Sequence, residues 1–488
     1  MSWKLALPSA IVCLSSFLLY SFDVWIRTRP FNPPDQTVNS TQQWDILRHL
    51  GGYSPWIHKT NGVLNIDVPE GCIVDQIHMM SRHAERYPTF NPGIRMLELY
   101  QRLQHENVTF RGDMMFLNGW NFFAPHPNDQ FDQLTTTGPY AGTLEAFATG
   151  VKLRTRYEKL LEEAVAKKQT SFWASDSQRV IETAQIFATG FFGLGWEKTA
   201  TLHVIPEDLE TGGNTLTPGH ACPKYGTDLE YGHNYGIKNL EVFRSTYLPA
   251  ISKRLKKENP GIVFTETEIY SMQEMCGFET LAKGSSHWCK VFTHDEWLSF
   301  EYARDLLYYY RSGPGNRYGP SLGWLWLNAT ADLLRQGPEA GPLFFSFNHD
   351  GDITAMLGAL NLFPQHPHLP NSRQLNDRAW RMSDVTPMAG RLIFERLSCP
   401  AEVTCWDNAQ YGYPNHLYCE PPHNDTYIRI NVNDGIVPMP DCRDGPGGAC
   451  PLEDFLERVR RRGEEVEPFH EICGVEEGKP RGIMFLHQ

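Results

Sequence analysis

The sequence has no excess of positive charge and no long uninterrupted hydrophobic run. Its 488 residues carry a formal net charge of −13, and the absence of a global basic field disfavours general nucleic-acid binding. The most apolar segment, residues 5–20, is interrupted by Pro8, Ser9, Ser15 and Ser16, whereas a membrane-spanning helix needs about 20 apolar residues. Internal repeats and low-complexity tracts are also lacking. With 41% hydrophobic residues, the chain can bury a large core.

The N-terminal segment has the composition of a secretory signal. Lys4 precedes the apolar residues 5–20, which predicts a signal peptide within residues 1–26. Since no clear small-x-small cleavage site follows, a retained signal anchor is the alternative for the same residues. Residues 27–60 begin with a polar, proline-bearing stretch, and we expect them to form an exposed N-terminal arm.

Cysteines and sequons also indicate export. One of the 11 cysteines, Cys13, lies in the predicted leader, and the ten others form an even set compatible with five disulfides. There is no CxxC pair, and the histidines near cysteines lack metal-ligand spacing, so we expect no metal site. The chain has four glycosylation sequons, at Asn39, Asn107, Asn328 and Asn424. Together these features predict a secreted or cell-surface glycoprotein.

Three apolar runs end in polar side chains and lead into helical patterns. They occupy residues 72–83, 171–179 and 342–350, and their lengths predict buried strands of βα units. The expected fold class is therefore α/β with a mainly parallel central sheet. Since ligands of such sheets bind at the carboxyl ends of the strands, the three polar clusters are expected to meet there. Residues 225–336 are predicted to be a mostly helical insertion, and residues 61–224 and 337–488 the α/β domain.

The first polar cluster has the residues of a phosphate site. In "SRHAERYPT", His83 lies between Arg82 and Arg86. A guanidinium group presents a planar fork of donors that fits phosphate oxygens, and a ring nitrogen held among such forks can attack the phosphorus. Arg179 would complete a cradle of three arginines that stabilises the transition state.

The third cluster supplies a candidate acid. Asp350 follows the predicted strand and opens a helix, so it could protonate a leaving alcohol. His349 beside it could donate to the phosphate. Each motif alone is common on protein surfaces. Only their joint placement at strand ends favours a catalytic site.

Two motifs resemble those of the histidine acid phosphatases. "SRHAERYPT" resembles the RHGxRxP signature of that family, and "FNHDGD" resembles its HD motif. "ASDSQRVIETA", "FTHDEWLSFEYARDLLYYY" and "VNDGIVP" are similar to segments of the fungal secreted acid phosphatase and phytase branch, and the similarity runs from about residue 72 to residue 473. The resemblance implies an α/β domain with a smaller α-helical domain, an active site in the cleft between them, and neither a metal nor an organic cofactor.

The resemblance also implies a role for each site residue. His83 matches the phosphorylated nucleophile and Asp350 the proton donor. The matching phosphate-binding residues are Arg82, Arg86, Arg179 and His349. Four disulfides are implied and a fifth pair is left over: Cys72–Cys419, Cys222–Cys473, Cys276–Cys289 and Cys442–Cys450, with Cys399–Cys405 remaining. The sequence departs from the signature at Ala84, where the family has glycine, and alanine would be costly if that position needs a positive φ.

These features predict an acid phosphomonoesterase acting on small phosphate monoesters through phospho-His83. Protonation of all 18 histidines would change the formal charge from −13 to +5, which favours anion processing in acid. A broad substrate range is preferred, because Lys283 and Lys290 are the only cations that the helical region suggests for further phosphates. The alternatives are a phytase and, given Ala84, a catalytically weakened phosphate-binding surface protein. A phosphoglycerate-type mutase shares only the Arg-His opening and fits the HD motif poorly.

Overall fold

The computed structural model describes residues 44–57, 64–403, 405–407, 417–419, 421 and 423–488. Residues from Ile46 onward form one compact unit. The predicted leader over residues 1–26 and the sequon at Asn39 lie outside the described residues. Within the described part, no helix is long and apolar enough to cross a membrane.

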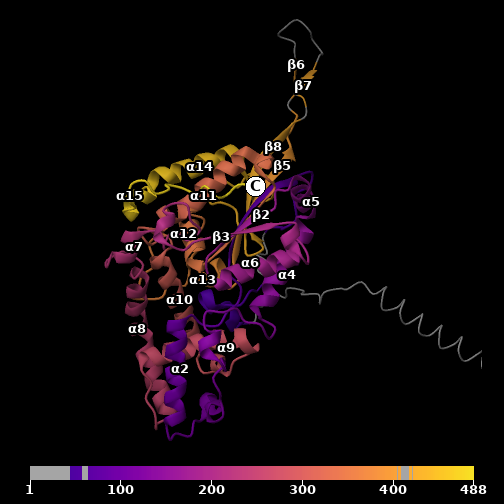
Figure 1. Ribbon diagram of the computed structural model, residues 1–488. Coiled ribbons are helices and arrows are strands. Elements are labelled where there is room, and N and C mark those ends of the chain that lie inside the picture. The colour runs from indigo at the N-terminus through magenta and orange to yellow at the C-terminus, as the bar shows by residue number, and fades with distance from the viewer. Residues whose placement is uncertain (1–43, 58–63, 404, 408–416, 420, 422) are drawn as a thin grey trace, which may run out of the picture. The chain divides into compact units, whose positions relative to one another are not determined.

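One large sheet organises the molecule, with strand order β10-β8-β5-β1-β4-β2-β3 (Figure 1). Four neighbouring strands run parallel: β1 (Ile73–Arg82), β4 (Leu343–Asn348), β2 (Ser171–Ser175) and β3 (Thr201–Ile205). The others pair antiparallel on the far side of β1: β5 (Arg391–Pro400), β8 (Asn424–Val432), β9 (Gly435–Ile436) and β10 (Cys450–Pro451). All six residues of β4 are buried, as expected of a central parallel strand covered on both faces.

Helices cover both faces of the sheet. On one face lie α4 (Gly142–Arg156), α5 (Glu158–Lys167) and α6 (Gln178–Phe191), where Phe187 packs edge-on to Phe345 of β4. On the other lie α11 (Gly319–Gln336), α12 (Asp350–Leu360) and α14 (Leu452–Glu465), where the ring of Phe455 packs at a tilt against Phe394 of β5. The predicted α/β class with its parallel central strands is thus confirmed, and the complete sheet is mixed.

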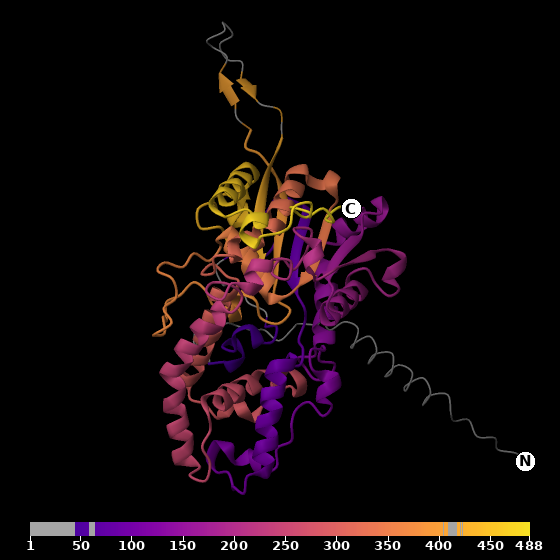
Figure 2. The same ribbon diagram turned by 60° about the vertical axis from the view of Figure 1, so that its left-hand side comes forward.

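A helical part lies beside the sheet layers, below them in Figures 1 and 2. It contains α2 (Phe90–His105), α8 (Tyr235–Glu258), α9 (Glu266–Lys283) and α10 (His294–Arg311). Helix α2 belongs here although it lies outside residues 225–336, because it packs against α9 and buries its apolar side, with Met96, Leu99 and Leu103. Conversely, α11 lies within that range but packs on α12 over the sheet.

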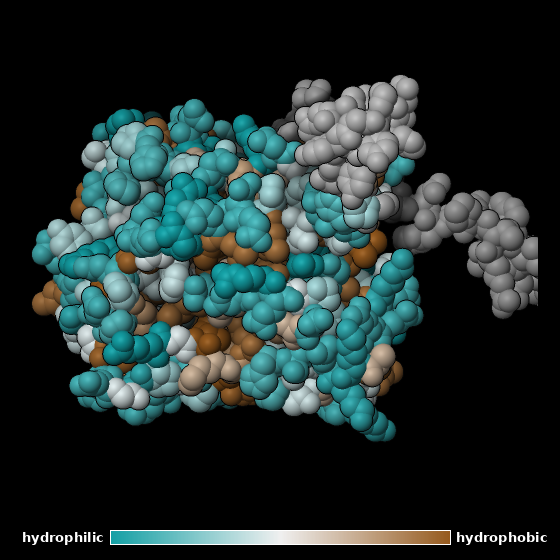
Figure 3. Space-filling view, turned by 90° about the horizontal axis from the view of Figure 1, so that it is seen from above, coloured by the Kyte–Doolittle hydropathy of each residue, from teal (hydrophilic) through white to brown (hydrophobic). Residues whose placement is uncertain are grey.

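Short helices complete the chain. The α-helical ones are α3 (Pro127–Gln130), α7 (Pro223–Thr227), α13 (Met382–Val385) and α15 (Phe469–Cys473). The 3-10 turns are η1 (Ile46–Arg48), η2 (Gly51–Tyr53), η3 (Gly112–Asn118), η4 (Trp196–Lys198), η5 (Leu209–Thr211), η6 (His287–Lys290), η7 (Gly337–Ala340) and η9 (Pro446–Gly448). On the face that Figure 3 shows, the exposed side chains are mostly hydrophilic and the hydrophobic ones lie mainly in recesses.

The prediction of an exposed arm over residues 27–60 is wrong for its described C-terminal part. Leu50 is fully buried and Tyr53 is 6% exposed. This segment is held by hydrogen bonds, because the Gly51 N–H donates to Ser383 Oγ at 3.0 Å and the Gly52 carbonyl accepts from Arg82 Nη1 at 2.6 Å. It packs against the first motif rather than in solvent.

Five disulfides join the described cysteines, and two of the predicted pairings are wrong. Cys222–Cys473, Cys276–Cys289 and Cys442–Cys450 are confirmed. The antiparallel register of β1 and β5 sets Ile73 opposite Ser398, so Cys72 bonds to Cys399 rather than Cys419.

The second correction follows from a small hairpin. Strands β6 (Cys405–Asp407) and β7 (Leu417–Cys419) pair with Cys405 opposite Cys419, and these two are bonded. The pair Cys399–Cys405 therefore does not form. The register of each strand pair determines which cysteines lie close enough to bond. The spacing of the cysteines in the sequence does not contain this information.

The described sequons differ in exposure. Asn107 and Asn424 are exposed. Asn328 is half-buried within α11, and Thr330 of the same sequon is fully buried.

Candidate active site

His83 follows the last residue of β1, and its backbone is fixed on both sides. Its N–H donates to the Asn348 carbonyl at 3.0 Å, and its carbonyl accepts from Ala389 N–H at 3.1 Å. The ring is buried, and Nδ1 lies 2.9 Å from the Ala84 carbonyl. Because a carbonyl oxygen only accepts, Nδ1 must carry the proton. In the neutral ring, Nε2 is then left with the lone pair of a nucleophile.

The surroundings keep that ring neutral. Burial lowers the pKa of His83 well below the ordinary value of a histidine, and neighbouring arginine charges lower it further. Protonation would place a further positive charge in a buried, already positive site. His83 therefore stays unprotonated in acid that would charge an exposed histidine.

Three arginines surround this histidine. Arg82 is fully buried and Arg86 is 6% exposed, whereas Arg179, in the first turn of α6, is partly exposed. The Nε–H groups of all three are buried and have no hydrogen-bond partner among the described residues. Since buried donors are normally satisfied, this set of donors is suited to an anion.

The corner between β4 and α12 brings His349 and Asp350 into the same site. The ring centroids of His83 and His349 are 5.7 Å apart. Asp350 Oδ2 lies 2.7 Å from Arg82 Nη2 and accepts a hydrogen bond from the Tyr308 hydroxyl at 2.8 Å. Burial by itself raises the pKa of Asp350, but the arginine charges and the Tyr308 hydroxyl outweigh it and hold the pKa well below its usual range. Asp350 is therefore ionised in the empty site.

A glutamate outside the predicted set of site residues orients His349. Glu207 follows β3, and its carboxylate accepts from His349 Nε2 at 2.8 Å and contacts His220 Nδ1 at 3.2 Å. The His349 Nδ1 lies 3.4 Å from Arg179 Nη2. The signal that could have found Glu207 is its place after a strand, because the segment "TLHVI" is followed by Pro206 and then by this carboxylate.

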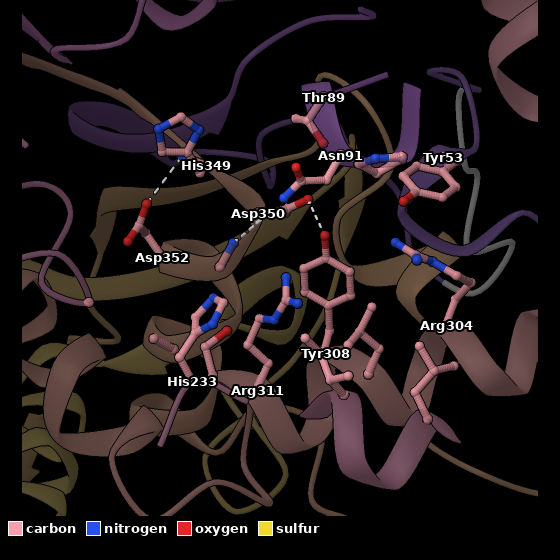
Figure 4. A pocket seen from close by; sticks show the side chains of 18 of the residues that line it. Tyr53, Thr89, Asn91, His233, Arg304, Tyr308, Arg311, His349, Asp350 and Asp352 are labelled. Atoms are coloured by element: carbon pink, nitrogen blue, oxygen red, sulfur yellow. Dashed lines mark hydrogen bonds between the residues drawn. The ribbon is translucent and has the colours of Figure 1, made fainter. Parts of the chain in front are cut away.

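Apart from the fully buried Arg82, these side chains line a cavity of about 900 Å³ (Figure 4). Its wall opposite the strand ends comes from the helical part and carries four more arginines: Arg95 of α2, Arg244 of α8, and Arg304 and Arg311 of α10. The two lysines suggested from the sequence are elsewhere, since Lys283 pairs with Glu279 at 3.1 Å and Lys290 is exposed on η6.

Ala84 does not obstruct the site. Its φ is not positive, and its side chain is fully buried in a small apolar cluster with Leu134, Ala146 and Ala389. The Ala84 N–H donates to Thr183 Oγ1 at 3.1 Å. The departure from glycine therefore strains neither the backbone nor the cavity.

All six site residues predicted from the sequence thus lie together at the carboxyl ends of parallel strands. A cluster of buried arginines around a neutral histidine, with a carboxyl group opposite, is the arrangement of a protein that transfers phosphoryl groups through histidine. The profile of the histidine phosphatase superfamily (branch 2) matches residues 73–433. The chain belongs to this family.

Relatives extend the match to most of the chain. A phytase of Candida albicans is 33% identical over 91% of this chain and 90% of its own length. An acid phosphatase of Komagataella pastoris is 33% identical over 92% and 90%. Among solved structures, the phytase from D. castellii superposes with a TM-score of 0.81 at 29% identity, covering 92% of this chain and 93% of its own.

Proposed function

We propose that this protein is an acid phosphomonoesterase that works in two steps through His83. In the first step Asp350 receives the proton of the bound ester monoanion, Nε2 attacks the phosphorus, the bond from phosphorus to the ester oxygen breaks, and Asp350 gives that oxygen the proton. In the second step water attacks the phosphohistidine, Asp350 takes the proton of the water, and the P–N bond breaks to release phosphate. The three arginines neutralise the transferring phosphoryl oxygens.

The observation that carries this proposal is the state of His83. Its Nδ1 is committed to the Ala84 carbonyl, and its environment disfavours protonation. The free Nε2 is therefore available as a nucleophile in acid, next to donors that have no partner within the described protein.

The test compares the wild type with His83→Ala in hydrolysis of p-nitrophenyl phosphate from pH 3 to 7. We expect activity that is highest in acid and disappears in the variant, with both proteins equally folded by circular dichroism. Rapid denaturation during turnover of ³²P-labelled substrate should trap label on the wild type only. Turnover without a trapped phosphoenzyme would contradict the covalent mechanism. A folded but inactive wild type would identify a phosphate-binding protein instead.

The arginines on the cavity wall favour the binding of substrates with more than one phosphate. Arg95 and Arg304 share the carboxylate of Glu274, at 2.9 Å and 3.9 Å. Neither Arg244 nor Arg311 forms an ion pair with a described residue, and the Arg311 Nε is buried without a partner. Unpaired guanidinium groups on a cavity wall favour additional anionic groups. We therefore propose that polyphosphorylated esters such as phytate are accepted along with simple monoesters.

Because Arg311 also contacts the ring of Tyr308, removal of Arg244 alone tests this range. We expect Arg244→Ala to lower kcat/KM for phytate by about 10-fold or more, since a charge-assisted contact contributes about 1.5–3 kcal/mol, and to change kcat/KM for p-nitrophenyl phosphate by less than about 2-fold. Arg335→Ala, on the surface of α11 and paired with Asp332, is the charge control. Equal losses on both substrates would show that the wall does not select for extra phosphates.

Export of the protein is proposed from its covalent features. Five disulfides join the described cysteines, which is typical of oxidising compartments, and Asn107 and Asn424 are exposed sequons. Enzymatic deglycosylation of protein made in a eukaryotic host should increase its gel mobility. Unchanged mobility would argue against passage through the secretory pathway.

A further inference from the structure

We infer that Tyr308 is a positioning residue for the catalytic acid, an inference that rests on the proposed function. The Tyr308 hydroxyl donates to Asp350 Oδ2 at 2.8 Å (Figure 4). The same carboxyl group is fixed at its other oxygen, because Gly351 N–H donates to Oδ1 at 2.8 Å. Helix α10 thus brings a residue of the helical part to the corner of β4 and α12.

The position of the Tyr308 ring is closely set by its neighbours. The side chain is 6% exposed, and the guanidinium groups of Arg304 and Arg311 lie 5.5 Å and 5.6 Å from its ring centroid. Such cation–π contacts restrain the plane of an aromatic ring. The hydroxyl is therefore aimed at Asp350 by packing, without help from a bound ligand.

The role of this hydroxyl differs from that of Arg82. Arg82 also contacts Oδ2, at 2.7 Å, but in the proposed mechanism its guanidinium group is shared with the phosphate. Among the residues that the structure describes, Asp350 is the only negative group within hydrogen-bonding distance of the Tyr308 hydroxyl, so the hydroxyl can stay on the carboxyl group throughout the reaction. Tyr308 would hold the carboxyl group of Asp350 in place while the Arg82 guanidinium group is shared with the phosphate.

The hydrogen bond also strengthens as the reaction proceeds. In the substrate complex Asp350 carries the proton, and Tyr308 donates to a neutral carboxyl group. As the O–H bond of Asp350 breaks and the leaving oxygen gains the proton, the acceptor becomes a carboxylate. Hydrogen bonds to ionised acceptors are roughly twice as strong as neutral ones, and an interaction that is stronger in the transition state accelerates the step.

This gain depends on how much proton transfer the leaving group needs. An alkyl ester such as glycerol 2-phosphate releases a basic alkoxide and requires the proton of Asp350. A p-nitrophenolate leaves with little protonation. Loss of the Tyr308 hydroxyl should therefore slow the first ester much more than the second, whereas a merely structural defect should slow both equally.

The experiment measures kcat/KM, which reports the phosphorylation step, for both substrates with Tyr308→Phe. We expect about a 10-fold loss with glycerol 2-phosphate, as for one charge-assisted hydrogen bond, and less than about a 3-fold loss with p-nitrophenyl phosphate. Tyr310→Phe is the matched control, because Tyr310 lies on the same helix and donates to the Leu369 carbonyl at 2.6 Å. In Tyr310→Phe, the ratio of the kcat/KM values for the two substrates should equal that of the wild type.

Two further measurements secure the result. In an Asp350→Asn background, Tyr308→Phe should have no added effect on glycerol 2-phosphate. If Tyr308→Phe does not fold, 3-fluorotyrosine at this position keeps the packing and makes a stronger donor, which should shift the ratio in the opposite direction. An unchanged ratio in an active enzyme that forms the phosphohistidine would overturn the role of Tyr308 alone. Absence of the phosphohistidine would overturn the proposed function itself.

Discussion

Ala84 replaces a glycine of the family signature at the centre of the first motif. Its backbone has no positive φ, and its methyl group packs away from the cavity with Leu134 and Ala146. We expect Ala84→Gly to change kcat/KM by less than about 2-fold and to destabilise the fold by about 1 kcal/mol, through a more flexible unfolded chain and a lost buried methyl group. Denaturant titration and p-nitrophenyl phosphate kinetics check both values. A large rise in activity would show that alanine impairs the site.

The ionised state of Asp350 predicts how activity depends on pH. Because the pKa of Asp350 is held well below its usual range in the empty site, the enzyme brings no proton on its acid. A phosphate monoester is a monoanion with one proton below its second pKa of about 6 and a dianion without it above. That proton can pass to Asp350 when the ester binds.

We therefore expect kcat/KM to fall as pH rises above about 6, following the titration of the ester rather than of the enzyme. With an ester of lower second pKa, this fall in kcat/KM should occur at lower pH. The shift should equal the difference between the second pKa values of the two esters. Paired pH profiles of two aryl phosphates make the comparison. If kcat/KM falls at the same pH for both esters, the titrating group belongs to the protein.

At the scale of the elements, the two corrected disulfides should contribute unequally to the stability of the fold. Cys72–Cys399 joins β1 to β5 and closes a segment of 327 residues, whereas Cys405–Cys419 closes 14 residues in a hairpin. Loop-closure entropy grows with the logarithm of the length, so the longer link should stabilise the fold by about 2–3 kcal/mol more.

We predict that Cys72→Ser/Cys399→Ser lowers the melting temperature several times more than Cys405→Ser/Cys419→Ser. Differential scanning calorimetry of both double variants provides the measurement. Equal shifts would mean that strain or residual structure outweighs chain entropy in this protein.

The elements also show what the sequence could and could not predict. His83, Arg179 and Asp350 could be found because each follows an apolar run that ends at the edge of the sheet. Tyr308 and Arg311 lie in "LLYYYR", where aromatic residues on a helix are typical of a packed core. Only the packing of α10 against α12 shows that one face of this helix reaches the cavity.

At the scale of the whole molecule, a buried acid makes folding stability depend on pH. Burial raises the pKa of Glu85 from 4.5 to about 8, and this side chain is 1% exposed. Between these values the folded state holds a proton that the unfolded chain has lost. The stabilising contribution is therefore complete below about pH 4.5 and is lost as pH rises towards 8.

Glu85→Gln cannot ionise and removes this dependence. We expect its melting temperature, relative to the wild type, to rise by roughly 3–6 °C between pH 5 and pH 8. Thermal unfolding across that range checks the sign. A constant difference would mean that Glu85 is already ionised in the folded protein.

The groups proposed for the reaction and the groups proposed for substrate selection lie on different kinds of element. The groups proposed for the chemistry follow β1, β2, β3 and β4, whereas the outer arginines of the cavity belong to α2, α8 and α10. Substitutions on those helices can alter which esters fit while the strand ends stay intact. Selection could therefore move a lineage from one phosphate source to another by changes on a few turns of α2 and α8. A directed-evolution library confined to these two helices, which leaves Tyr308 of α10 unchanged, would sample new substrates at little risk to the reaction.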